Sequence, residues 1–106
     1  MPKFLIKGNY SAEGVKGLMK EGGSARRTAV EKAIAPVNGK IEAFYYALGE
    51  TDVFVVVDLP NATSAAALSM AVNSTGLVNI RVVALLTAEE IDAASKITVR
   101  YTPPKA

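Results

Sequence analysis

The chain opens on a stretch in which polar and apolar side chains alternate. Within residues 3–10, KFLIKGNY, the side chains of Phe4, Ile6 and Tyr10 share one face. A period of two residues is typical of a β-strand, so a strand is expected here. Ser11 follows directly, and its hydroxyl can accept a free backbone N–H at the start of a helix. The pattern therefore predicts a strand and then a helix.

Two adjacent glycines interrupt the expected first helix. Val15 and Leu18 recur at helical spacing, and the sequence EGGS then occupies residues 21–24. Each glycine inside a helix costs roughly 1 kcal/mol relative to alanine. We expect a break here, with Ser24 capping a second helical segment that ends at Pro36.

The middle of the chain repeats this alternation of elements. Apolar runs predict strands over residues 40–48 and 51–58, joined by a link short enough for a hairpin. Residues 62–73, ATSAAALSMAVN, predict a thin helix whose small side chains can lie close to a sheet. A fourth strand is expected over residues 77–85.

The C-terminal part begins with a helix signal. Thr87 and Glu90 are three residues apart in TAEE, which is typical of a capping box. The helix is expected to run to about Ser95. Residues 96–101, KITVRY, then predict one more strand-like piece, closed by two prolines.

This order of elements predicts one α+β domain over residues 1–106. It matches the ferredoxin-like βαββαβ pattern, an antiparallel sheet with two helices on one face. A short C-terminal helix and a strand-like tail follow the pattern. A chain of 106 residues is long enough to bury a modest core.

The predicted strands carry bulky apolar side chains on both faces. Residues 53–57, VFVVV, do not alternate, and residues 44–48 and 78–86 also offer bulk on both sides. An antiparallel sheet with one solvated face should alternate. We therefore expect a homo-oligomer that forms through the sheet face, because large exposed apolar patches are rare. Two alternatives stay open: the tail strand exchanges onto a neighbour's edge, or the last helix and tail fold back over the open face.

Composition limits the chemistry. The chain has no cysteine and no histidine, which excludes disulfides, thiolate nucleophiles, and cysteine or histidine ligands for zinc or haem. No metal and no cofactor are therefore expected. The net charge is only +2, and Arg26-Arg27 is the one adjacent basic pair, so nucleic acid is not an expected partner.

Targeting signals are missing from the sequence. The N-terminus, MPKFLIKGNY, lacks the apolar core and cleavage site of a signal peptide. No apolar run reaches the length of a membrane span, so no membrane association is expected. A cytoplasmic location is the expectation.

Several segments together carry a family resemblance. They are FYYALGETDVFVVVDLP at 44–60, NSTG at 73–76, LLTAEE at 85–90, YTPP at 101–104, ARRTAVEKAI at 25–34 and NGKIEAFYYALG at 38–49. In these segments the chain resembles the GYD-domain family of small bacterial proteins, which is named for a Gly-Tyr-Asp motif. Gly49 and Asp52 match the Gly and Asp of that motif, whereas Thr51 stands where the Tyr is expected. No role of that ring is therefore carried over.

The resemblance implies membership of the dimeric α+β barrel group, which agrees with a sheet that is apolar on both faces. Relatives of that fold include cofactor-independent monooxygenases, haem enzymes and plain ligand-binding modules. A shared fold does not decide among these functions.

The stretch GETD allows two interpretations. In the structural one, Gly49 takes a positive φ and the Asp52 carboxylate accepts backbone N–H groups in a turn. In the functional one, Asp52 lies at the mouth of a pocket beside Glu42, Tyr45 or Tyr46 and acts as an acid or base.

Three further residues are candidates for ligand binding. Tyr10 and the other strand aromatics most often serve core or interface packing; alternatively, they line a cleft that takes a small hydrophobic molecule. Lys7 lies next to Gly8 in the first strand. Arg81, inside an apolar strand, can anchor a carboxylate, or pair with an acid across an interface. Arg26-Arg27 can hold an anion near a helix start or simply be solvated.

Two functions stay open at this stage. The first is a homo-oligomeric ligand-binding or structural module without catalysis. The alternative is a cofactor-independent enzyme, monooxygenase-like or isomerase-like, that acts on a small hydrophobic substrate. For an isomerase, an N-terminal Pro2 could act as a base, as in the tautomerases. The absence of histidine, the usual base at neutral pH, favours the first function.

Overall fold

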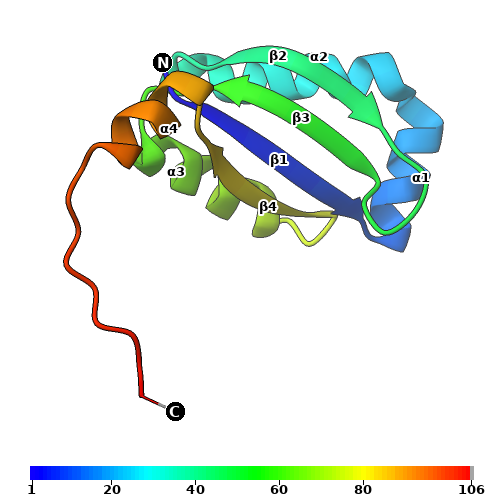
Figure 1. Cartoon of the computed structure of the whole chain (residues 1–106). Coiled ribbons are helices and arrows are strands. Elements are labelled where there is room, and N and C mark those ends of the chain that lie inside the picture. Colours follow the sequence, from blue (N-terminus) through cyan, green and yellow to red (C-terminus); the bar gives the residue numbers. More distant parts are fainter. Residues whose placement is uncertain (106) are drawn as a thin grey trace.

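Strand β1 is an inner strand of a four-stranded antiparallel sheet in the computed structural model, which describes residues 1–105 (Figure 1). The order across the sheet is β2-β3-β1-β4. The strands are β1 (Lys3–Tyr10), β2 (Lys40–Tyr46), β3 (Val53–Asp58) and β4 (Val78–Leu85). The predicted α+β class is confirmed.

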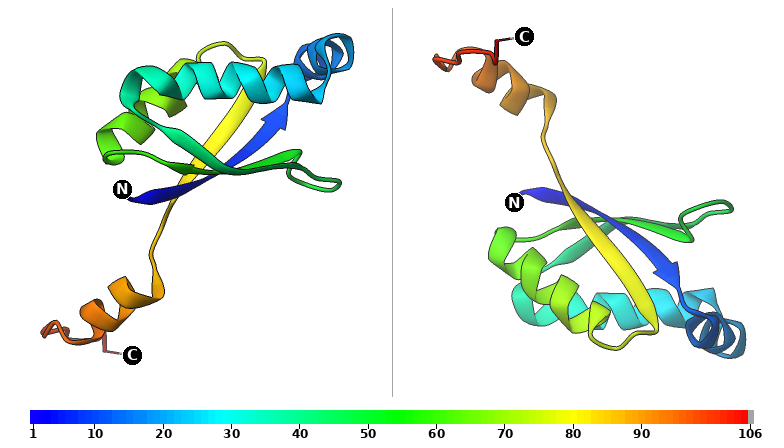
Figure 2. Two further views of the ribbon diagram at one scale, coloured as in Figure 1. Left: turned by 90° about the horizontal axis from the view of Figure 1, so that it is seen from above. Right: turned by 90° about the horizontal axis from the view of Figure 1, so that it is seen from below.

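Three helices cover one face of this sheet (Figure 2). Within residues 1–105 the chain forms four α-helices, namely α1 (Ala12–Glu21), α2 (Gly23–Ile34), α3 (Ala62–Asn73) and α4 (Ala88–Ser95). A 3-10 helix, η1 (Ala35–Val37), ends α2. Helices α1, α2 and α3 form the layer that lies on the sheet, whereas α4 stands apart from it.

The core lies between this helical layer and the sheet. Alternate side chains of β1 and β3 point into it, as period-two alternation requires. The buried apolar side chains are Phe4, Ile6, Ile34, Val53, Val55, Val57, Leu59, Ala65, Leu68 and Ile80. This packing fixes which side chains of each strand remain on the other face.

The predicted helix break is present, but its cap is not Ser24. Helix α1 ends at Glu21, and Gly22 takes φ 90° and ψ 159°, a conformation that is essentially restricted to glycine. Helix α2 begins at Gly23, and the Gly22 carbonyl accepts the N–H of Arg26 at 3.3 Å. The turn at Gly22 therefore starts the helix before Ser24, which lies inside its first turn.

Helices α1 to α3 leave the second face of the sheet uncovered. The middle row of this open face joins Leu5 of β1 to Val56 of β3 and to Val83 of β4, as direct cross-strand partners. The next row pairs Tyr45 with Phe54. We call this surface the open face and define it by residues Leu5, Lys7, Tyr45, Phe54, Val56, Arg81 and Val83.

Residues 86–105 form an arm that leaves the sheet after β4, on the side of the open face (Figures 1 and 2). The strand expected over 96–101 is not formed, because a strand needs a neighbour for its backbone groups and these residues have none in the described chain. The alternative in which helix and tail fold back over the open face is also wrong. Every residue of the arm is exposed.

Candidate functional site

The GETD stretch forms a turn that is tied to β1. Gly49 has φ 127°, a conformation that side chains other than glycine rarely adopt. The Asp52 carboxylate accepts the backbone N–H of Tyr10 at 2.9 Å, and the Asp52 N–H donates to the Gly8 carbonyl at 2.9 Å. These bonds give Asp52 a structural role at the end of the β2–β3 hairpin.

The four acid–base candidates do not lie together. Tyr45 and Tyr46 are adjacent in β2 and therefore point to opposite faces of the sheet. Tyr45 is on the open face, whereas the Tyr46 hydroxyl donates to the Gly23 carbonyl of α2 at 3.0 Å. Glu42 is at the far end of β2 from the hairpin that contains Asp52. Glu42, the other carboxylate among the four candidates, therefore does not lie beside Asp52.

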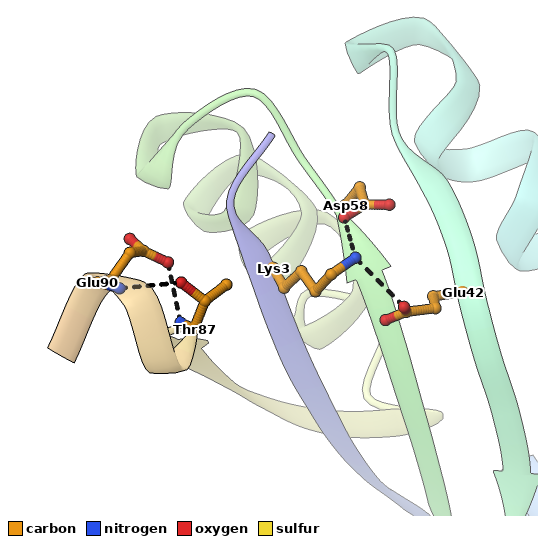
Figure 3. A network of polar contacts seen from close by, with 5 residues as sticks. All are labelled: Lys3, Glu42, Asp58, Thr87 and Glu90. Carbon is orange, nitrogen blue, oxygen red and sulfur yellow. Dashed lines mark hydrogen bonds and ion pairs between the residues drawn. The ribbon is translucent and has the colours of Figure 1, made fainter. Parts of the chain in front are cut away.

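Glu42 belongs instead to an ion-pair group at the beginning of β1 (Figure 3). The ammonium of Lys3 donates to Asp58 at 2.8 Å and lies 3.3 Å from a carboxylate oxygen of Glu42. The hydrogen bond to Asp58 raises the pKa of Lys3 above its ordinary value; dehydration opposes this effect and Glu42 adds to it. Both carboxylates at this end of the sheet are therefore engaged with Lys3.

An apolar cleft lies between the helices and the sheet. Its volume is about 520 Å³, and a hollow of about 100 Å³ shares part of its lining. The residues that line both are Tyr10, Arg26, Ala33, Leu68, Val72 and Val78. Small-molecule sites commonly measure about 300–1,000 Å³ and are mostly apolar with a few polar groups. This cleft has those properties.

The polar groups of the cleft gather where α1 meets α2. Arg26 lies 3.7 Å from the carboxylate of Glu21, and both line the cleft with the ring of Tyr10. The pKa of Tyr46 is raised to about 12, chiefly because burial disfavours the phenolate and further because Tyr10 is close, while the charge of Arg26 acts in the opposite direction. Tyr46 itself does not line the cleft, which can therefore offer a ligand the cation of Arg26, the carboxylate of Glu21 and the phenol of Tyr10.

The sequence pattern did not separate Arg26 from Arg27, but the structure does. Arg26 is partly buried and lines the cleft, whereas Arg27 is exposed and lies 3.7 Å from Glu31 on the surface of α2. Helical spacing could have separated them, because residues 26, 29, 30 and 33 share one face of a helix, and the apolar residues on that face predict that it points inward.

A second, polar hollow lies on the open face. Lys7 of β1 and Arg81 of β4 are direct cross-strand partners, although they are far apart in the sequence. They line a notch of about 430 Å³ with Asn9, Glu50, Thr51 and Asn79. Two of the three predicted ligand residues thus meet here, and Tyr10 does not join them because it lines the cleft on the other side of the sheet.

Neither hollow has the character of a metal site. Among residues 1–105, no three acidic side chains converge in a way that could hold a metal ion.

In the same part of the chain, none of the helices combines the length and apolarity that a membrane crossing requires.

Comparison with protein families identifies the chain. The family model described as GYD domain matches residues 4–95, which is most of the chain. The chain therefore belongs to the GYD domain family, and the resemblance inferred from the sequence is confirmed. Comparisons with curated proteins and with solved structures returned no match.

Proposed function

We propose that this GYD-domain protein is a homo-oligomeric binding module that assembles through the open face of its sheet. The observation that carries the proposal is the apolar middle of that face. Leu5, Val56 and Val83 form a continuous row that helices α1 to α3 leave uncovered. Packing two such rows together, about 10 Å apart, removes both from water. The strand order also supports a ferredoxin-like arrangement of the subunit.

A charge on the open face tests the assembly. Val83 is 44% exposed, so Val83→Glu is compatible with a folded subunit. We expect this variant to raise the dissociation constant of the oligomer at least about tenfold, since a buried unpaired carboxylate is costly. Sedimentation velocity over a range of concentrations measures the change.

Val15→Glu is a matched control on the opposite side of the molecule. Val15 lies on α1 and is 40% exposed, so the substitution adds the same charge to a similarly exposed valine. The oligomer should keep its wild-type affinity in this variant. A wild-type protein that stays monomeric at high micromolar concentration would contradict the assembly.

The cleft favours a second part of the proposal, the binding of a small hydrophobic molecule. Its walls are mostly apolar, and its charged groups are Arg26, Glu21, which lies 3.7 Å from Arg26, and Glu13. A largely apolar ligand therefore suits it better than a strongly polar one. The fluorescent probe 1-anilinonaphthalene-8-sulfonate has this chemistry and reports binding through its emission.

Two substitutions on one helix separate cleft binding from nonspecific binding. Ala71 lines the cleft and Ala66 does not, although both are exposed residues of α3. Ala71→Leu should fill part of the cleft and weaken binding of the probe several-fold, whereas Ala66→Leu should leave it unchanged. Equal effects of the two variants would remove the cleft as the site.

The enzymatic alternative receives less support from this geometry. The carboxylates proposed as acid or base, Asp52 and Glu42, bind backbone N–H and Lys3 respectively, and neither lines the cleft. A cytoplasmic location, and partners that include neither nucleic acid nor membrane, remain predictions from the sequence and form part of the proposal.

A further inference from the structure

Lys7 and Arg81 form a like-charge pair in the middle of the notch. Cross-strand partners have side chains about 5 Å apart at Cβ, and two cations directly opposite each other repel. Among residues 1–105, neither side chain forms an ion pair with an acid. One carboxylate, that of Glu50, lines the same notch without forming an ion pair with either cation, so the notch keeps an excess of positive charge.

The helix at the start of the arm carries the opposite charge, although Lys96, Arg100 and Lys105 further along make residues 86–105 neutral as a whole. Helix α4, with the sequence AEEIDAAS, has three acidic residues and no basic one. Glu90 is engaged in the capping box, where its carboxylate accepts the Thr87 N–H at 2.9 Å (Figure 3). Glu89 and Asp92 have no such engagement among the described residues, and they lie three apart on one side of the helix.

The arm also exposes apolar side chains that a small ion would not cover. Ile91 is 52% exposed, and Ile97, Val99 and Tyr101 are each more than 60% exposed. The alternation of Ile97, Val99 and Tyr101 along the tail is that of a strand without a partner. A protein surface therefore fits the arm better than a free anion does.

The rows of the open face determine where a second copy places its arm. The row of Leu5, Val56 and Val83 lies between a row that contains Arg81 and a row that contains Leu85. Consider a two-fold axis that lies between the two packed sheets and runs parallel to the middle row, across the strands. Each strand then packs on the same strand of the partner in the opposite direction. Arg81 therefore faces the C-terminal end of the partner's β4, where the partner's arm begins. The arm already lies on the side of the open face (Figure 2).

We infer that residues 86–105 embrace a second copy of this chain, with Glu89 and Asp92 of α4 neutralising Lys7 and Arg81 of the partner subunit. The inference rests on the proposed assembly through the open face and specifies its symmetry. Each notch is thus incomplete without the other subunit, and each subunit supplies one arm and one notch.

Complementary charge reversals test this contact. Arg81→Glu in one chain, and Glu89→Arg with Asp92→Arg in another, each set like charges against one another in a homodimer. We expect each variant alone to weaken dimerisation at least about tenfold. In the heterodimer of an equimolar mixture, one contact is native, and in the other the glutamate introduced at position 81 of one chain meets the two new arginines of its partner while Lys7 stays a cation. The heterodimer should therefore bind more tightly than either homodimer.

Native mass spectrometry of the mixture, with one variant labelled with ¹⁵N, distinguishes the heterodimer from both homodimers by mass. Glu31→Arg on α2 is the control, because it makes one acid-to-arginine substitution of the same kind on the helical side of the molecule. Dimers of this control should match the wild type in sedimentation velocity. Circular dichroism confirms that each variant is folded.

A chain that ends at Leu85 provides a second measurement. It lacks the arm but retains all four strands. We expect it to dimerise weakly, and Arg81→Glu in this background should cause no further loss of affinity. A monomeric wild type overturns the assembly itself. A wild-type dimer that is indifferent to Arg81→Glu, or variants that do not recover on mixing, overturn only the arm contact.

Discussion

At the scale of single residues, Gly14 shows how closely α1 approaches the segment before β4. A Cβ at this position would overlap the carbonyl oxygen of Leu77, which accepts the N–H of Ser11 at 2.9 Å. Gly17, one turn further along α1, has open space around it. The absence of a side chain is therefore required by a close backbone contact at Gly14, whereas no such contact requires it at Gly17.

This contrast gives a prediction for unfolding. Gly14→Ala should lower the free energy of unfolding by about 1–3 kcal/mol, because backbone must move to admit the methyl group. Gly17→Ala should raise it by up to about 1 kcal/mol, since alanine favours a helix. Urea denaturation of both variants measures the difference, and equal stabilities would contradict the close approach of α1 to Leu77.

The phenol of Tyr46 gives a prediction for alkaline pH. Its pKa is raised from 10.0 to about 12 in the folded protein. Below pH 10 both the folded and the unfolded chain hold the proton, and the contribution to stability is complete. Between pH 10 and pH 12 the unfolded chain releases the proton first, so the free energy of unfolding falls as the pH rises.

Tyr46→Phe should flatten this alkaline decline, although the variant also loses the bond to the Gly23 carbonyl at neutral pH. Thermal unfolding between pH 9 and pH 11 in both proteins measures the slopes. Absorbance near 295 nm, compared between them, assigns the late-titrating phenol. A wild-type slope that persists in the variant would assign the effect to another group.

Among the candidate residues, Lys7 and Arg81 could be selected singly from the sequence, Lys7 as a cation next to Gly8 in the first strand and Arg81 as a cation inside an apolar strand. Their meeting could not, because it depends on the register between β1 and β4. The separation of Tyr45 from Tyr46 needed no structure, since adjacent strand residues face opposite ways. The loss of a shared site around Asp52 follows from that alternation together with the position of Glu42 at the far end of β2.

At the scale of elements, periodicity located β1 and α3 at the bounds that the structure shows. Residues 96–101 have the same alternation as β1 but form no strand. Alternation predicts which face of a strand would be buried, but it does not show whether a neighbouring strand is present. A local sequence pattern alone therefore could not predict the conformation of the tail.

The helix starts give a prediction at this scale. The Ser11 hydroxyl accepts the N–H of Gly14 at 3.1 Å, whereas Ser24 lies beyond the Gly22 cap of α2. Ser11→Ala should therefore lower the free energy of unfolding by about 1 kcal/mol. Ser24→Ala should change it by less than about 0.5 kcal/mol. A larger loss at Ser24 in urea denaturation would place the start of α2 there.

At the scale of the whole molecule, one face of the sheet is covered by helices and the other is not. Helices α1 to α3 cover one, and the other keeps an apolar row across β3, β1 and β4. The sequence predicted this duality from VFVVV, because a run without alternation is apolar on both sides. It did not predict the notch or the direction of the arm, which depend on how distant segments meet.

Association through the open face predicts a melting temperature that depends on protein concentration. Binding that is restricted to folded subunits stabilises them by mass action. Differential scanning calorimetry of the wild type should show the melting temperature rising over a tenfold range of concentration. Val83→Glu should lose this dependence. A wild-type value that is constant across the range would argue against a weak, reversible oligomer.

The position of β1 within the sheet also has a consequence for the order in which the protein can form. This strand comes first in the chain, yet its two neighbours are β3 and β4, from residues 53–58 and 78–85. During synthesis both edges of β1 therefore stay unpaired until Asp58 has emerged from the ribosome, and the edge that pairs with β4 stays unpaired until Leu85 has emerged. Pairings this distant close slowly, and unpaired edges invite aggregation. The earliest strand is thus the one that a nascent chain must protect for longest.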